Sequence, residues 1–215
     1  MISTRNLLLL PDADRLRRVL QSMALLDRIL CPEWEFRYYS FDAAWAPGAQ
    51  MGSMRDGSGD DFFVHFSAAG CWMKGFSHES PMSPYRRSPP RPWAGVLDDV
   101  PSDFAECLRE PAFSVEDVTF CIWRRPGDPT WQIGHINFPR SHPDPDGSES
   151  LLSSLDGRPE TYRAWATDYY ERDVDAAAVE HVYRHEPLTP EVIARLNPEV
   201  SLEQLSQDIR SIGYL

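Results

Sequence analysis

The sequence is poor in lysine and cysteine, and it has no long hydrophobic run. The apolar run at residues 7–10 ends at Pro11, whereas a transmembrane helix needs about 20 apolar residues. The run is also shorter than the apolar stretch of a secretory signal peptide, which has about 7–15 residues. We therefore predict a cytoplasmic protein with no signal peptide and no membrane partner.

Cysteine is scarce and widely spaced, at positions 31, 71, 107 and 121, with no C-x-x-C pair. This spacing excludes a disulfide scaffold and a zinc ribbon. Buried, reduced thiols are expected instead, in agreement with a reducing cytoplasm. No cofactor is predicted, since the chain has no P-loop, no G-x-S-x-G elbow and no dinucleotide-binding glycine motif.

Basic residues are also fewer than acidic ones. The chain has 33 acidic and 21 basic residues, a net charge of −12, and Lys74 is the only lysine, which leaves 20 arginines. Residues 140–215 hold 15 acidic residues and 7 arginines, or −8, which leaves −4 for residues 1–139. A negative field repels phosphate, so nucleic acid is not expected as a partner, whereas a basic protein is.

The N-terminal part of the chain predicts one helix followed by strands. Apolar residues recur every three or four positions over residues 12–30, with Asp12 or Asp14 as the cap. Residues 33–41 alternate aromatic and polar side chains, which predicts a strand with Trp34 and Phe36 on one face. A loop through residues 47–61 is expected to follow.

Two hairpins are predicted beyond this loop. Residues 62–68 and 71–76 flank a two-residue turn, and residues 118–124 and 131–138 form the second pair. The proline-rich segment between the hairpins is expected to be irregular, with one short helix capped by Ser102.

The last third of the chain predicts short helices. Residues 139–150 have the composition of a linker that crosses the surface. Helices are expected near 159–169, 175–185, 190–196 and 201–212, and the last begins with a capping box. The fold class is therefore α+β, a mostly antiparallel sheet with an N-terminal helix and a C-terminal group of short helices. We predict a single domain over 1–215, with a helical subdomain at 151–215 as the alternative.

Two loops contain the candidate binding residues. The stretch at 51–61 has acids around two glycines, which favours a tight turn over a ligand site, and the stretch at 77–85 contains a histidine beside a glutamate. The candidate residues are Arg55, Asp56, Asp60, Asp61, His78, Glu79 and Tyr85. Adjacent residues of an extended chain point to opposite faces, so a partner for His78 is expected from elsewhere, such as Arg55 or Asp60.

His181 and His185 lie four residues apart on a predicted helix, a spacing that can bind zinc. The glutamate of the H-E-x-x-H motif is absent, since Val182 follows the first histidine. A solvated or helix-end pair is therefore favoured over a metal site.

Four stretches of the chain are similar to a family of uncharacterised bacterial proteins. They are MGSMRDGSGDDFFVHF, KGFSHESPMSP, EPAFSVEDVTFCIWR and HEPLTPEVIARLNPE, which spread over most of residues 45–213. The resemblance implies a bacterial origin and one full-length unit, and it implies no activity and no functional residues.

These observations predict a non-enzymatic binding protein of the bacterial cytoplasm. Its most concrete form is an immunity-type protein that neutralises a basic toxin, because strong acidity speeds association with a basic partner. The alternative is a small hydrolase or transferase with its site on the 51–61 and 77–85 loops, which requires these loops to converge. A third class is a protein that dimerises through a sheet edge.

Overall fold

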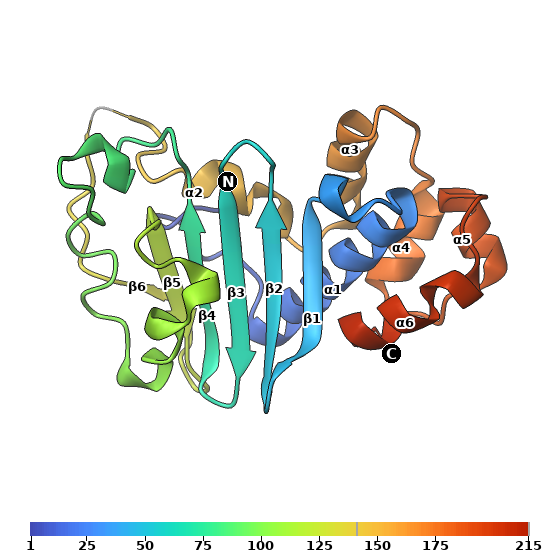
Figure 1. The fold of residues 1–215 in the computed structure, drawn as a ribbon, viewed down its shortest axis with the longest axis horizontal. Helices are drawn as coiled ribbons and strands as arrows, with labels where there is room; N and C mark the ends of the chain where they lie inside the picture. The colour runs from blue at the N-terminus through green and yellow to red at the C-terminus, as the bar shows by residue number, and fades with distance from the viewer. Residues whose placement is uncertain (141, 215) are drawn as a thin grey trace.

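A computed structural model describes residues 1–140 and 142–214 and contains the predicted α+β fold (Figure 1). A six-stranded antiparallel sheet has the strand order β1-β2-β3-β4-β5-β6. The strands are β1 (Tyr39–Ala46), β2 (Ala49–Arg55), β3 (Asp61–Ser67), β4 (Gly70–Phe76), β5 (Phe120–Arg124) and β6 (Gln132–Ile133). The helices are α1 (Ala13–Leu30), α2 (Ser148–Leu152), α3 (Pro159–Tyr169), α4 (Ala176–Tyr183), α5 (Pro190–Leu196) and α6 (Leu202–Ile212).

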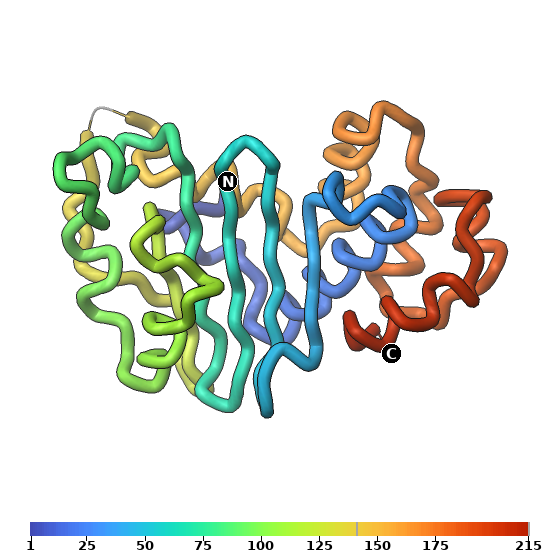
Figure 2. Tube along the Cα trace, in the orientation of Figure 1, coloured from blue at the N-terminus to red at the C-terminus, as the bar shows by residue number. Residues whose placement is uncertain are grey.

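Each face of the sheet is covered by a different layer. Helix α1 lies behind the sheet in Figure 1, and the irregular chain between β4 and β5 crosses in front of it (Figure 2). Alternate residues of one strand enter the two cores, so Phe62 and Val64 of β3 face α1 while Phe63 faces the irregular layer. The sheet is thus buried on both sides over its central strands.

The predicted helix at residues 12–30 is confirmed with its cap. Asp12 accepts a hydrogen bond from the backbone N–H of Arg15 at 2.9 Å, and Pro32 follows the end of the helix. Helices α3 to α6 also match their predicted positions, and the capping box of Ser201 and Gln204 is present. The helices of the last third pack on α1 and on β1, and one apolar core joins them to the sheet.

The predicted strand at residues 33–41 is wrong. Trp34–Phe36 form a 3₁₀ turn, called η1, and β1 begins only at Tyr39. Asp27 of α1 decides this boundary, because its carboxylate accepts the backbone N–H groups of Tyr38 at 2.9 Å and Tyr39 at 2.8 Å. Trp34 and Phe36 are consequently exposed on the surface and do not join a sheet face.

The predicted loop over 47–61 is wrong over residues 49–55, which form β2, the second strand of the sheet. The segment AQMGSMR has no β-branched or aromatic residue, the types that are enriched in strands, so the local sequence does not indicate a strand. Gly52 permits close packing, since a Cβ there would lie 2.9 Å from Leu20 Cδ1 of α1. Tertiary packing therefore determines this strand.

Three smaller predictions need correction. The short helix after Ser102 is a series of separate 3₁₀ turns, at Ser102–Phe104, Cys107–Arg109 and Pro111–Phe113. The second hairpin is confirmed, but β6 has only two residues. The linker at 139–150 does not stay on the surface, because residues 145–148 are buried.

The buried part of this linker is held by the N-terminus of the chain. The hydroxyl of Thr4 donates to Asp146 at 2.5 Å, and the hydroxyl of Ser148 donates to the same carboxylate at 2.7 Å. Buried polar groups are stable only when paired, so these bonds anchor the segment beside the sheet.

Candidate functional site

The β2–β3 loop is built around the side chain of Asp56. One oxygen of its carboxylate accepts the backbone N–H groups of Ser58 at 2.8 Å, Gly59 at 3.0 Å and Asp60 at 2.9 Å. Burial raises the pKa of Asp56, but these hydrogen bonds outweigh it and leave the pKa below its ordinary value. Gly57 and Gly59 have φ of 75° and 121°, which glycine adopts without strain. The loop is the tight turn that the sequence predicts.

Asp60 and His78 form a carboxylate–imidazole pair. Asp60 Oδ1 lies 2.6 Å from His78 Nδ1 and accepts the backbone N–H of His78 at 2.8 Å. The hydrogen bond to Asp60 raises the pKa of His78. The second ring nitrogen, Nε2, is 4.0 Å from a carboxylate oxygen of Glu79. Of the two partners that the sequence suggests for His78, Arg55 and Asp60, the structure pairs it with Asp60.

Asp61 pairs with the only lysine of the chain. Lys74 Nζ lies 2.8 Å from Asp61 Oδ1 and donates to the backbone carbonyl of Asp117 at 2.8 Å. The Lys74 side chain is 0% exposed and its ammonium lies 5.2 Å from the ring centre of Phe63. Burial raises the pKa of Asp61, and the charge of Lys74 opposes this rise. This pair is buried, so Lys74 stabilises the sheet end and does not face solvent.

The other candidate residues surround these pairs. The guanidinium of Arg55 lies 5.2 Å from the ring centre of Phe63. The hydroxyl of Tyr85 donates to Asp117 Oδ1 at 2.6 Å, which raises the pKa of Tyr85. All seven predicted residues are therefore gathered where β2 and β4 end and β3 begins, a region we call the β2–β4 end. Sequence reasoning missed Asp117, since no local pattern marks it.

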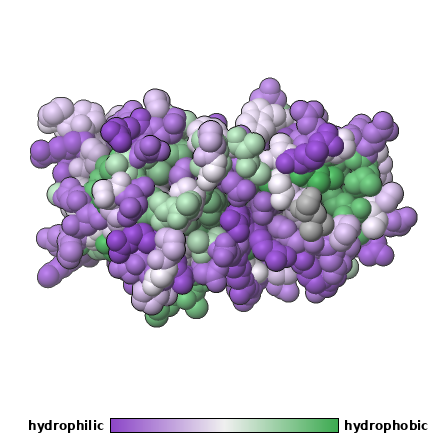
Figure 3. Space-filling view, turned by 90° about the horizontal axis from the view of Figure 1, so that it is seen from below, coloured by the Kyte–Doolittle hydropathy of each residue, from purple (hydrophilic) through white to green (hydrophobic). Residues whose placement is uncertain are grey.

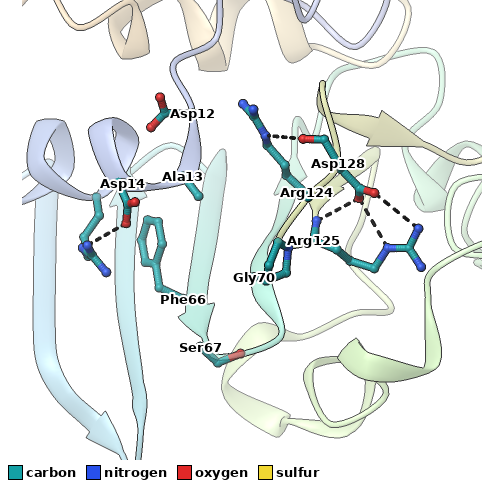
Figure 4. Close-up of a pocket in the computed structure, with 12 residues that line it drawn as sticks. Asp12, Ala13, Asp14, Phe66, Ser67, Gly70, Arg124, Arg125 and Asp128 are labelled. Carbon is teal, nitrogen blue, oxygen red and sulfur yellow. Dashed lines mark hydrogen bonds and ion pairs between the residues drawn. The ribbon is translucent and has the colours of Figure 1, made fainter.

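Five cavities in the described part of the chain lie away from the β2–β4 end, and none of them is lined by Arg55, Asp60 or His78. One has a volume of about 300 Å³ and lies between the start of α1, the β3–β4 turn and the β5–β6 loop (Figure 4). Its charges pair with one another: Arg17 lies 2.8 Å from Asp14, and Arg125 Nε lies 3.3 Å from Asp128. This cavity has no excess charge to attract an ion.

His181 and His185 do not share a ligand position. His181 Nδ1 lies 2.9 Å from Glu186, whereas His185 Nε2 faces the backbone carbonyl of Arg18 at 2.9 Å and stacks on Tyr214. Each ring is thus held by a different part of the fold. Within residues 1–140 and 142–214, no group of three or more His, Cys, Asp or Glu side chains is placed to hold a metal ion.

A second surface, which the sequence did not predict, lies between the start of β1 and α3 (Figure 1). Trp34 is 59% exposed, Phe36 is 64% exposed and Tyr169 of α3 is 40% exposed. The hydroxyl of Tyr169 donates to the backbone carbonyl of Phe36 at 3.3 Å, which joins the two elements. Large exposed aromatic side chains gathered in one place are typical of interaction surfaces. We call these three residues the aromatic patch.

Seen from below, the molecule is mainly hydrophilic. Figure 3 shows a face on which polar residues dominate, with a hydrophobic area over the C-terminal helices. Leu202 of α6 is among the exposed large hydrophobic residues of the chain. No described helix is both long and apolar enough to cross a membrane.

Comparisons with known proteins give no relative. No protein-family model, no curated protein sequence and no solved structure matches the chain. The resemblance to a bacterial family therefore stays a prediction, and function has to be argued from the surfaces of this chain alone.

Proposed function

We propose that this chain is a non-enzymatic binding protein of the bacterial cytoplasm, whose acidic surface recognises a basic protein. The observation that carries the proposal is a set of exposed carboxylates in the last third of the chain. None of them has a basic group within 4.0 Å among the described residues. They are Glu160, Asp168, Glu171, Glu191, Glu199 and Glu203.

Four of the seven arginines of residues 140–215 are engaged elsewhere, and the six unpaired carboxylates outnumber Arg140, Arg195 and Arg210, which form no ion pair among the described residues. Arg158, Arg163 and Arg184 form ion pairs with acidic neighbours, and Arg172 donates to the backbone carbonyl of Leu30. The free charge of this surface is therefore negative. Such a surface attracts a positively charged protein and raises its association rate, most strongly at low ionic strength.

An immunity-type protein is the most concrete version of this function. It has to bind a toxin quickly and to hold it in an inactive complex, which an acidic surface achieves when the toxin is basic. The proposal requires no catalytic group, and it uses carboxylates that make no ion pair within the described fold.

Affinity capture from a bacterial lysate tests the proposal. The wild-type protein and the variant E160Q/E191Q/E199Q/E203Q are immobilised, and the bound proteins are identified by mass spectrometry at about 50 and 500 mM salt. We expect the wild type to retain a basic protein at low salt that high salt releases. The variant removes four exposed charges and should retain much less of it. Equal capture by both proteins, or no basic protein at either salt concentration, would contradict the proposal.

The Asp60–His78 pair supports a second candidate function, a small hydrolase or transferase. A carboxylate that holds one ring nitrogen orients the imidazole and leaves the other nitrogen free to take a proton. His78 Nε2 is in this position at an exposed loop. Against this function, none of the five cavities lies beside the pair.

Hydrolysis of chromogenic ester and phosphate substrates by the wild type and by H78Q separates the two functions. The binding proposal predicts the same background rate for both proteins. A rate that H78Q lowers by about 100-fold, as general-base catalysis implies, would favour the enzyme.

A further inference from the structure

We propose that the aromatic patch, with Glu33 and Glu35 beside it, is the docking centre for arginine side chains of a partner protein. This inference rests on the proposed function and specifies which part of the surface binds the partner. The residues Glu33, Trp34, Glu35 and Phe36 alternate acid and aromatic along one exposed segment. A guanidinium can pair with a carboxylate and stack on an aromatic ring at the same time, which an ammonium does less well.

The patch is available for such contacts. Glu33 and Glu35 have no ion-pair partner within 4.0 Å among the described residues, and both are exposed. Trp34 and Phe36 are 59% and 64% exposed, so more than half of each side chain faces solvent, although Arg37 lies over the Trp34 ring. Exposed tryptophan and phenylalanine gain free energy when a partner covers them, and tryptophan and tyrosine are enriched at binding hot spots.

The chain itself shows that this surface accepts a guanidinium. Arg37 lies with its guanidinium carbon 5.8 Å from the ring centre of Trp34. It is held there by a hydrogen bond from Nε to the backbone carbonyl of Cys31 at 2.9 Å. Arg37 offsets one of the two glutamate charges of the segment, so the turn keeps a net charge of −1.

One residue of the patch, Tyr169, belongs to a stack of aromatic rings that holds it in place. Tyr169 stacks on Trp165 with ring centres 5.1 Å apart and an angle of 15°, and it meets the edge of Tyr38 at 5.1 Å. Asp27 fixes the chain just after the turn through the N–H groups of Tyr38 and Tyr39. A pre-organised surface loses less conformational entropy on binding.

The negative charge extends from the patch toward the β2–β4 end. The charge of Asp56 raises the pKa of Tyr38, after the larger effect of burial. Glu171 follows α3 closely and is exposed without an ion-pair partner within 4.0 Å among the described residues. A basic segment seated on the patch therefore meets acids on both sides, and this complementarity favours a cationic occupant over an apolar one.

Fluorescence anisotropy with labelled nona-arginine and nona-lysine peptides tests the inference at about 20 mM salt. We expect nona-arginine to bind the wild type more tightly than nona-lysine. W34A/F36A should weaken nona-arginine binding by about tenfold, the loss expected for two exposed cation–π contacts. The matched control L8A/L9A removes two exposed apolar side chains elsewhere, 82% and 59% exposed, and should bind like the wild type.

The outcomes distinguish this inference from the proposed function. If W34A/F36A binds nona-arginine as tightly as the wild type, the inference is overturned. If binding then falls instead in E191Q/E199Q/E203Q, the acidic surface of the last third still acts as proposed. If the wild type binds neither peptide, both ideas fail. Circular dichroism of each variant checks that loss of binding is not loss of fold.

Discussion

At the scale of single residues, Asp27 lies where α1, β1 and α3 meet. Its carboxylate accepts hydrogen bonds from the backbone N–H groups of Tyr38 and Tyr39, at the start of β1. It also accepts one from the hydroxyl of Tyr162 of α3, at 2.6 Å. Asp27→Ala would leave these three buried donors without an acceptor, at about 1–3 kcal/mol each. We expect a loss of at least about 3 kcal/mol in the free energy of unfolding, measured by urea denaturation. A loss below about 1 kcal/mol would show that Asp27 does not join these elements.

The same residue gives the fold a pH dependence. Burial raises the pKa of Asp27 from 3.8 to about 6, because desolvation outweighs its hydrogen bonds. The protonated form is therefore favoured by folding, so this stabilisation is complete below pH 3.8 and is lost as the pH rises through about 6. The span corresponds to about 3 kcal/mol.

Asp27→Asn provides the reference for this pH effect, since an amide does not titrate. The difference in unfolding free energy, wild type minus Asp27→Asn, should fall by about 2 kcal/mol between pH 4 and pH 7, since at pH 4 the unfolded carboxyl is already partly ionised. A difference that is constant with pH would contradict the raised pKa.

The ion pair of the buried Lys74 with the partly buried Asp61 also stabilises the fold. Removing one partner of such a pair leaves a buried charge unpaired and costs about 3–5 kcal/mol. We expect K74M to lose stability in this range or slightly less, since Asp61 is 25% exposed. The double variant K74M/D61N should recover most of the loss, as measured by thermal denaturation. If the double variant is no more stable than K74M, Lys74 does not stabilise the fold through its ion pair with Asp61.

At the scale of elements, close packing of β4 on β5 depends on Gly75. A Cβ at this position would lie 2.1 Å from Phe120 Cζ, a distance at which something must move. We expect Gly75→Ala to cost more than about 2 kcal/mol, because small-to-large changes in a packed core force displacement. Gly57→Ala is the control, since its Cβ would meet nothing within 4 Å, and its positive φ should cost only about 1 kcal/mol. Equal losses in the two variants would contradict the packing account.

Elements with local signals could be predicted from the sequence, and elements decided by tertiary contacts could not. The cap of α1 at Asp12 and the capping box of α6 are fixed by nearby residues, and both predictions are confirmed. By contrast, β2 has weak strand formers and needs neighbours on both sides. The start of β1 depends on Asp27, which lies 11 and 12 residues away in sequence.

The candidate residues show the same division. Asp60 could be suggested as one of two partners of His78, beside Arg55, because the hairpin between Asp60 and His78 returns the chain to the same end of the sheet. Asp117 comes from the irregular layer, whose path has no periodic pattern, and it was missed. The aromatic patch was not predicted, because aromatic and polar residues alternate over residues 33–38 and this pattern indicates a strand. In the structure the exposed segment forms a turn.

At the scale of the whole molecule, the acids and the aromatic patch lie on the same part of the fold. The last third of the chain packs beside the β1 edge, next to the turn that holds Trp34 (Figure 1). In the sequence, the acidity is concentrated in residues 140–215, whereas the candidate loops at 51–61 and 77–85 belong to the sheet half of the chain. The fold brings the turn before β1 against α3, where the hydroxyl of Tyr169 donates to the backbone carbonyl of Phe36.

The association rate of a captured basic partner tests the central claim most directly. Stopped-flow measurements would compare the wild type with E160Q/E191Q/E199Q/E203Q at about 20 and 200 mM salt. Electrostatic steering predicts a wild-type rate constant that falls by about tenfold or more as salt rises. The variant should associate slowly at both salt concentrations. Equal rate constants for the two proteins at low salt would contradict the claim that this acidic surface recruits a basic partner.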